Sequence, residues 1–255
     1  MTKLWQNITR ERKLTVGYQP IIHRTKWANF FFLIMKRDPS MEGVFKCPNN
    51  LTVATVNTYR EKSLFEKSLD YVGVDHVVLQ EPFKGPWKSI FKLKFVLNYL
   101  KSGSCKTDYF LYCDARDAIL WDDPQKIVDV LESTECDLLF GSTMFKGGWM
   151  CMPKVREWTK TVARKKGRYL NAGVFIGKPD FIKEVLEEAS KYFSKKGLTK
   201  LQYDKLGRGL RDTKLCKALP KYPKGALDQD ILRFLHPKFY PKMDIDYRNQ
   251  IAYRN

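Results

Sequence analysis

Hydrophobic runs of strand length alternate with segments of helical periodicity through most of the chain. Residues 51–57 form a run rich in β-branched side chains, and residues 75–80 form a second one. Between them, apolar residues recur at helical spacing near residues 64–71. A strand, a helix and a strand at this spacing predict a parallel sheet covered by helices, because parallel strands need a crossover connection.

The same alternation continues toward the C-terminus. Residues 87–101 carry apolar side chains at helical spacing, and Gly103 ends that helix. The other expected elements are a strand that ends before Asp114, a helix after Pro124, strands over residues 137–141 and 169–177, helices over residues 180–193 and 227–235, and a closing edge strand over residues 245–253. We therefore expect an α/β fold.

The first 50 residues are different in character from the rest. They mix basic segments with one strongly apolar run, residues 27–35, which is well short of the roughly 20 residues that span a bilayer. We expect this run to be a buried strand rather than a membrane-surface anchor, and we expect no transmembrane segment. Residues 1–50 are then an N-terminal arm packed on a main domain of residues 51–255.

The charge balance indicates an anionic partner. The formal net charge is +18 and the isoelectric point is about 9.6. A nucleotide, a nucleic acid, a phosphorylated glycan or a membrane surface has the complementary charge. The lysines are scattered rather than gathered in a tail, and no nucleic-acid-binding motif is visible, so we do not expect a nucleic-acid partner.

The cysteines and the N-terminal residues bear on the cellular compartment in which the protein is expected. Six cysteines lie far apart without a CxxC pair, which argues against a zinc site. No apolar core follows the first residues, so they do not form a signal peptide. We expect a reducing compartment and a cytoplasmic location.

Two acids stand where a strongly apolar strand ends. Residues 109–113 are aromatic and apolar, and Asp114 and Asp117 follow them directly. Carboxylates in such a place need compensation by a cation or by hydrogen-bond donors. Mg²⁺ and Mn²⁺ prefer carboxylate oxygens. The motif alone therefore leaves two interpretations open: a metal site that holds a diphosphate, or a helix cap or salt bridge with Arg116 as the partner.

Several segments, in their order along the chain, resemble those of a GT-A glycosyltransferase. They are the strand over residues 52–57, the Asp-x-x-Asp pair Asp114 and Asp117, Leu170-Asn171-Ala172-Gly173, Leu227-Asp228-Gln229, and the close from Ile245-Asp246 to Ile251-Ala252-Tyr253. The chain is most similar to the group that contains the glycosyltransferase domain of procollagen lysyl hydroxylases and related procollagen and viral sugar transferases. The resemblance covers about residues 51–255 and implies a GT-A, Rossmann-like fold with a mixed, mainly parallel central sheet flanked by helices.

The resemblance also implies the roles of particular residues. Asp114 and Asp117 are expected to hold Mn²⁺ or Mg²⁺, and the metal to hold the diphosphate of a nucleotide-sugar donor, a UDP-sugar above all. The other donor-binding residues are expected to be Thr55, Asn57, Thr58, Tyr59, Lys92, Arg116, Asn171, Ala172, Gly173 and Gln229. Asp228 is expected to contact the sugar or to act as the general base. Helix capping by Asp228 and a solvated helix face for Lys92 stay open as alternatives.

The chain departs from this group in two places. Cys151-Met152-Pro153 stands where the procollagen enzymes carry Cys-Trp-Pro in the acceptor loop, which puts collagen as the acceptor in doubt. Their further metal-binding histidine lies beyond the closing strand, where this sequence has already ended. His236 is the only histidine near that end, and it stands at a different place. A third protein ligand for the metal is therefore not identified.

These observations predict a metal-dependent glycosyltransferase that moves a sugar from a nucleotide-sugar to a hydroxyl of a glycan or glycoprotein. One alternative is a nucleotidyltransferase of related fold, which is weakened because no Gly-rich phosphate loop follows the first strand. Another is a non-catalytic basic module that binds glycan or nucleic acid, but such a module does not need acids at a strand end. The sequence leaves open whether the chain is a complete protein or one domain of a longer one.

Overall fold

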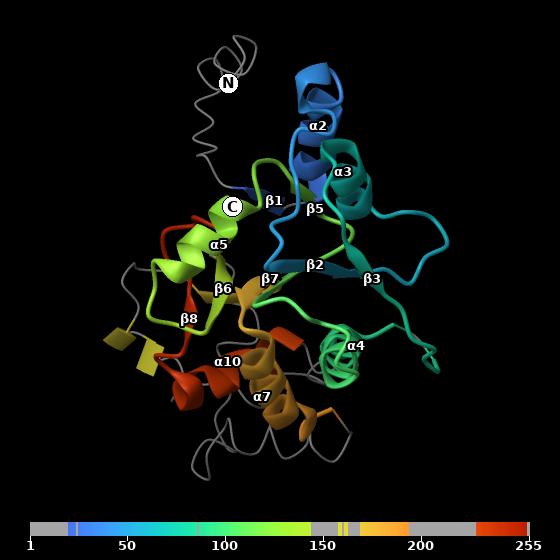
Figure 1. Ribbon diagram of the computed structural model, residues 1–255. Coiled ribbons are helices and arrows are strands. Elements are labelled where there is room, and N and C mark those ends of the chain that lie inside the picture. Colours follow the sequence, from blue (N-terminus) through green and yellow to red (C-terminus); the bar gives the residue numbers. More distant parts are fainter. Residues whose placement is uncertain are drawn as a thin grey trace, which may run out of the picture.

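The structure, a computed structural model, describes residues 20–23, 25–85, 87–143, 158–159, 161–162, 169–193 and 228–253. The Cys-Met-Pro segment at residues 151–153 lies outside these ranges. A six-stranded sheet forms the centre of the fold, in the order β3-β2-β4-β7-β6-β8 (Figure 1). Its strands are β2 (Leu51–Val56), β3 (Val77–Leu79), β4 (Tyr109–Cys113), β6 (Leu138–Thr143), β7 (Tyr169–Gly177) and β8 (Met243–Ile245).

The direction of the strands confirms the expected mixed, mainly parallel sheet. Strand β2 is parallel to β3 and to β4, and β6 is parallel to β8. Strand β7 is antiparallel to both of its neighbours, β4 and β6, so it alone among the described strands of this sheet runs the other way. The carboxyl ends of β2 and β4 therefore lie at one edge, where open α/β sheets bind their ligands.

Helices cover both faces of this sheet. On one face, α4 (Ile90–Lys101), α7 (Pro179–Ser190) and α10 (Asp228–Phe239) share a core with Val56, Phe110 and Phe140, and Figure 1 shows these helices grouped together. On the other face, α3 (Leu64–Val72) and α5 (Gln125–Glu132) share a core with Val53 and Leu111. The strands β2, β4, β6 and β7 are buried on both faces, which explains why their sequences read as largely apolar runs.

Local signals set the ends of α3. The Ser63 hydroxyl accepts a hydrogen bond from the Glu66 N–H, and the Glu66 carboxylate accepts one from the Ser63 N–H, which together form a capping box. Gly73 follows the helix with a φ of 84°, a left-handed conformation that glycine adopts without steric cost. The helix places the Glu66 carboxylate beside the end of β2.

A smaller sheet brings together three distant parts of the chain. Its order is β5-β1-β9, and its strands are β1 (Ile21–His23), β5 (Ala118–Leu120) and β9 (Ala252–Tyr253). Strand β1 is antiparallel to β5 and parallel to β9. The described part of the N-terminal 50 residues thus contributes a strand, and this strand ends next to the turn that follows β4.

Two expectations from the sequence are wrong. The apolar run at residues 27–35 belongs to helix α2 (Thr25–Met35), whose residues Ala28, Phe31 and Met35 are buried at helical spacing. A short 3-10 helix, η1 (Pro39–Met41), follows it. The closing segment is not one edge strand but two short strands, β8 and β9, in different sheets. Asp246 separates them by accepting hydrogen bonds from the N–H groups of Arg248 and Ile251.

The other strands and helices expected between residues 51 and 239 are present, with their ends shifted by a few residues. Strand β5 was not expected, because three apolar residues after an acidic turn carry little signal. None of the described helices combines the length and the apolar character that crossing a membrane requires.

Candidate metal centre

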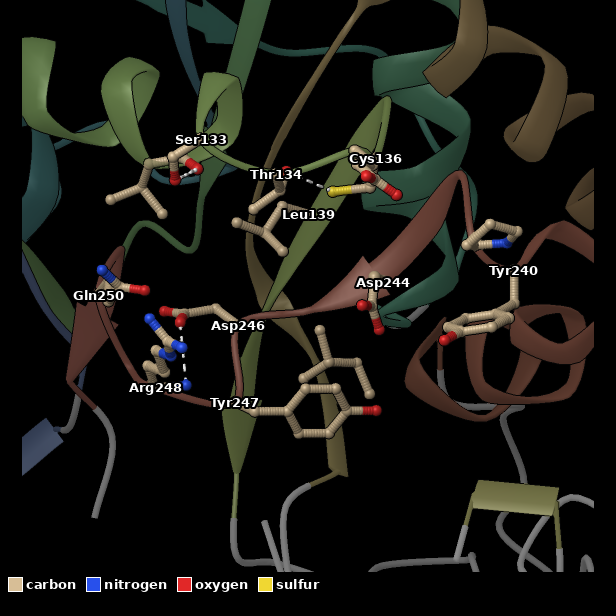
Figure 2. Close-up of a pocket in the computed structure, with 14 residues that line it drawn as sticks. Ser133, Thr134, Cys136, Leu139, Tyr240, Asp244, Asp246, Tyr247, Arg248 and Gln250 are labelled. Carbon is tan, nitrogen blue, oxygen red and sulfur yellow. Dashed lines mark hydrogen bonds between the residues drawn. The ribbon is translucent and has the colours of Figure 1, made fainter. Parts of the chain in front are cut away.

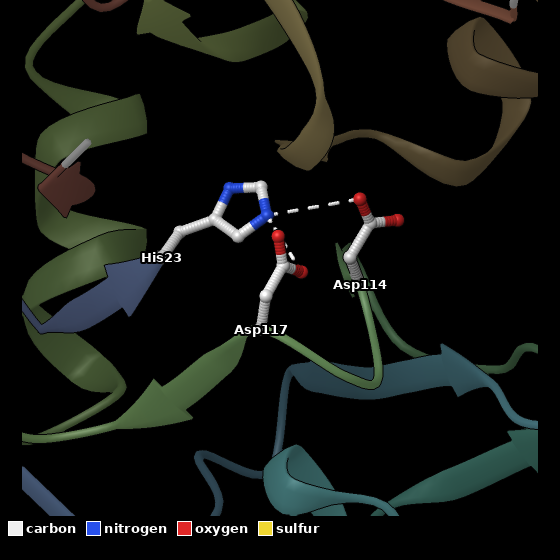
Figure 3. A group of neighbouring side chains, drawn as sticks. All are labelled: His23, Asp114 and Asp117. Carbon is white, nitrogen blue, oxygen red and sulfur yellow. Dashed lines mark hydrogen bonds and ion pairs between the residues drawn. The ribbon is translucent and has the colours of Figure 1, made fainter. Parts of the chain in front are cut away.

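Three side chains from separate parts of the fold converge at the end of β4. His23 ends β1, and Asp114 and Asp117 lie in the turn between β4 and β5 (Figure 3). His23 Nε2 is 3.1 Å from Asp117 Oδ1 and 3.7 Å from Asp114 Oδ2. One ligand atom of each residue lies within 4.8 Å of those of the other two. The imidazole is buried, whereas the carboxylate side chains are 29% and 26% exposed, so the group opens toward solvent on its acidic side.

A missing side chain makes room for this group. Gly173 in β7 accepts the hydrogen bond of the Asp114 N–H through its carbonyl oxygen, at 2.8 Å. A Cβ atom on Gly173 would overlap the His23 ring and lie 2.6 Å from Asp114 Oδ2. The space above the glycine is therefore the space in which the imidazole and the carboxylate meet. Two carboxylates and one imidazole held in this way fit Mn²⁺, and fit Mg²⁺ through the carboxylate oxygens.

Asn171 sets the orientation of the His23 ring. This buried side chain lies in β7, with its Nδ2 3.2 Å from His23 Nδ1, and its Oδ1 accepts a hydrogen bond from the Gly173 N–H at 3.1 Å. With the amide in this orientation, Nδ1 is an acceptor and the neutral ring carries its proton on Nε2, which donates to Asp117. Coordination of a metal through Nε2 requires the other tautomer, with the ring proton on Nδ1, and the Asn171 amide must then turn over and give up its hydrogen bond from the Gly173 N–H.

A buried ammonium connects the centre to helix α10. Lys92 Nζ on α4 lies 3.0 Å from Asp114 Oδ1 and 2.5 Å from Asp228 Oδ2. Burial by itself lowers the pKa of Lys92, but the adjacent carboxylates of Asp114 and Asp228 raise this pKa by more than burial lowers it. The net shift is upward, and the ammonium stays charged. Lys92 is therefore part of the site rather than of a solvated helix face.

Tyr112 completes the hydrogen bonding of Asp114. Its hydroxyl donates to Asp114 Oδ1 at 3.0 Å. Burial, and then the charge of Asp114, raise the pKa of Tyr112 well above its usual value, so the phenol remains a donor. Asp114 Oδ1 is thus held by two donors, while Oδ2 faces His23.

A cavity of about 410 Å³ adjoins the centre. Its lining includes Asp114 and Asp117, the cations Lys92 and Arg116, and two exposed aromatic residues, Tyr59 and Trp87. The Arg116 guanidinium carbon lies 3.7 Å from the centre of the Tyr59 ring, so one face of the ring is covered by the cation. Trp87 was not singled out from the sequence, since it reads there as the first residue of an expected helix.

The residues expected at the end of β2 divide into two groups. The Thr55 hydroxyl is fully buried and donates to the Cys113 carbonyl oxygen, and Asn57 donates to Glu66 and accepts from the Tyr59 N–H. These two side chains hold the loop. Asn57, Thr58 and Tyr59 all line the cavity, but Asn57 is only 3% exposed, so Thr58 and Tyr59 are the ones placed to meet a ligand.

The residues expected on β7 and α10 are buried next to the centre or connect the two elements. Asn171 and Ala172 are each only 1% exposed. Gln229 accepts a hydrogen bond from the Ala172 N–H through Oε1 at 3.4 Å, which ties α10 to β7. Asp228 reaches the centre through Lys92.

The third member of the metal group is a residue that the sequence did not reveal. His236, the only histidine near the C-terminus, is buried 3.8 Å from Asp244 and is not part of this group. His23 comes from β1, which pairs in parallel with β9, the last described strand. A lone histidine after Ile21 and Ile22 carries no signal of this kind by itself.

A larger cavity lies elsewhere, beside β8 (Figure 2). Its volume is about 580 Å³, and its lining includes Cys136, Asp244, Asp246 and Tyr247. The Asp246 carboxylate is engaged by two backbone N–H groups. The described residues place no His/Asp/Asp group of the kind found at His23 in this cavity, so size alone does not make it the candidate site.

Replacing His23 by glutamine is expected to weaken Mn²⁺ binding at least about tenfold, because the imidazole nitrogen that can coordinate the metal is then absent. Isothermal titration calorimetry with MnCl₂ measures this directly. The matched control is His76→Gln, since His76 is a partly buried histidine outside the group whose ring contacts the Val74 carbonyl. Equal Mn²⁺ affinities of His23→Gln and His76→Gln would show that His23 is not a ligand of the metal.

Comparison with known proteins adds no family to this description. A scan against protein-family models finds no matching family, and a search of the curated proteins finds no match either. The geometry of the centre and the resemblance of its motifs are what support a function.

Proposed function

We propose that the protein is a metal-dependent glycosyltransferase of the GT-A fold, which moves a sugar from a nucleoside-diphosphate sugar, above all a UDP-sugar, to a hydroxyl of a glycan or glycoprotein. The observation that carries the proposal is the His23, Asp114 and Asp117 group, whose two carboxylates line a cavity together with cations and exposed aromatic rings. The reversed strand β7 within an otherwise parallel sheet supports it at the level of the fold.

The residues of the cavity suit the parts of such a donor. Asp114 and Asp117 would hold Mn²⁺ or Mg²⁺, which when bound supplies a Lewis acid that stabilises a diphosphate leaving group. Bare carboxylates would repel a diphosphate, whereas Lys92 and Arg116 attract it. The exposed part of the Tyr59 ring offers a surface on which a nucleobase stacks.

Asp228 is the candidate for the acceptor side of the reaction. In the transfer, the acceptor hydroxyl oxygen forms a bond to the anomeric carbon, and the bond from that carbon to the diphosphate oxygen breaks. The diphosphate leaves with the electron pair, and the hydroxyl proton goes to a base. Lys92 forms an ion pair with Asp228 and with Asp114, so the Asp228 side chain lies close to the centre, where it would contact the sugar or accept this proton.

The described cysteines Cys47, Cys105, Cys113 and Cys136 are free thiols. This agrees with a reducing compartment, and we place the enzyme in the cytoplasm. A glycan or glycoprotein acceptor, rather than nucleic acid, remains the proposed partner.

A thermal-shift screen tests the donor. UDP-, GDP- and CMP-sugars are compared with and without Mn²⁺, and at a concentration of a hundred times the dissociation constant the correct donor is expected to raise Tm by about 5–10 °C only when Mn²⁺ is present. A shift with oligonucleotide but with no nucleotide-sugar would contradict the proposal and favour a nucleic-acid-binding module. A shift with nucleoside triphosphates alone would favour a nucleotidyltransferase.

A further inference from the structure

The two oxygens of Asp114 face different partners. Oδ1 accepts hydrogen bonds from Lys92 and Tyr112, whereas Oδ2 faces His23. Lys92 is nearly buried, with 9% of its side chain exposed, and it lies between Asp114 and Asp228. A fixed cation therefore sits inside the group of carboxylates that would attract a metal.

The net charge of this group determines how strongly it attracts a divalent metal when no nucleotide is bound. Asp114, Asp117 and Asp228 contribute three negative charges and Lys92 one positive charge, so the formal sum is −2 with a neutral His23. Removal of the ammonium changes the sum to −3. A unit positive charge and a dication a few ångströms apart repel each other. Even at an effective dielectric constant near 20, this repulsion lowers the affinity for the metal by more than about a hundredfold.

The same ammonium has the opposite effect on an anion. A lysine has three donor hydrogens, two of which point to Asp114 and Asp228, and Lys92 also lines the cavity. A diphosphate in the cavity is attracted by both the metal and the ammonium. Lys92 thus opposes the binding of metal alone and favours the binding of metal together with nucleotide.

We propose that Lys92 couples the two binding events, so that a divalent metal binds tightly only together with a nucleoside diphosphate. This regulation of the site rests on the proposed function, because it requires a nucleotide in the cavity. The coupling is reciprocal: the factor by which UDP tightens the metal is the factor by which the metal tightens UDP.

The test measures Mn²⁺ affinity by electron paramagnetic resonance, with and without saturating UDP. Lys92→Gln removes the charge while its amide can still donate to Asp114, so the orientation of the carboxylate is disturbed little. This variant is expected to bind Mn²⁺ alone at least about tenfold tighter than the wild type. The gain in affinity from removing the repulsion between ammonium and metal exceeds the loss from weaker positioning of Asp114. The tightening produced by UDP is expected to be at least about tenfold smaller than in the wild type.

Two further variants make the result specific. Lys94→Gln removes the same charge from an exposed position of the same helix and is expected to behave as the wild type. Lys92→Arg keeps the cation and is expected to keep weak binding of Mn²⁺ alone and strong coupling to UDP. If Lys92→Gln does not fold, Lys92→Arg provides the test. The proposal is then overturned if Lys92→Arg binds Mn²⁺ as tightly without UDP as with it.

The outcomes separate this inference from the proposed function. Equal or weaker binding of Mn²⁺ alone by Lys92→Gln overturns the role of Lys92, whatever nucleotides do. If UDP has no effect on Mn²⁺ binding by the wild type, the proposed function is contradicted, and the coupling that rests on it is lost with it.

Discussion

Replacing Asp117 by asparagine is expected to lower Mn²⁺-dependent hydrolysis or transfer of the UDP-sugar by at least about a hundredfold, with the fold intact. Asparagine keeps an oxygen that accepts the hydrogen bond from His23 Nε2, now 3.1 Å away, but it loses the negative charge that attracts the metal. Asp117 is about one quarter exposed, so the exchange leaves no buried charge unpaired. Release of UDP over time, with and without Mn²⁺, measures the effect.

Asp114→Asn is expected to give the same loss of activity with an additional loss of stability. Lys92 and Tyr112 both donate to Asp114 Oδ1, so removal of the charge leaves the buried ammonium with only Asp228 as its ion-pair partner among the described residues. For this reason Asp117→Asn is the cleaner variant.

The matched control for the carboxylate is Asp180→Asn. Asp180 has a 93% exposed side chain, pairs with Lys183 on the surface, and lies outside the site. Such an exposed pair is screened by water and contributes little, so activity and stability are expected to change little. Full activity of both Asp117→Asn and Asp114→Asn, or full activity in excess chelator, would rule out the metal centre.

Replacing Gly173 by alanine is expected to reduce Mn²⁺ affinity about a hundredfold, although no ligand is removed. The added Cβ overlaps the His23 ring and lies 2.6 Å from Asp114 Oδ2. His23 is only 1% exposed, so the ring has no free space into which to move. One of the two side chains must leave its place, and overpacking of this kind also costs about 1–3 kcal/mol of stability.

Calorimetric titration with MnCl₂ and thermal unfolding measure both parts of this effect. Gly141→Ala is the matched control, because a Cβ on this glycine of the neighbouring strand β6 meets its nearest atom at an ordinary 3.5 Å. It is expected to bind Mn²⁺ as the wild type does. Unchanged affinity in Gly173→Ala would mean that His23 and Asp114 do not form one centre.

The layered α/β fold was largely predictable because its signals are local. A β-branched run such as β2 and the capping box of Ser63 and Glu66 act within a few residues, and each is read directly from the chain. Helix α2 shows the limit of this: its phenylalanines favour a strand by propensity, yet packing of Phe31 and Met35 against the body of the protein produces a helix.

The candidate site was predictable only in part, for the same reason. The sequence determined that two acids follow a buried strand and that a cation is needed to compensate them, because burial of carboxylates is costly wherever they occur. Only the tertiary structure decided which groups meet them. The pairing of β1 with β5 and β9 brings His23 to Asp117, a separation of 94 residues, and the packing of α4 against α10 places Lys92 between two carboxylates. Such contacts depend on long-range strand pairing and on helix packing, neither of which leaves a periodic pattern in the chain.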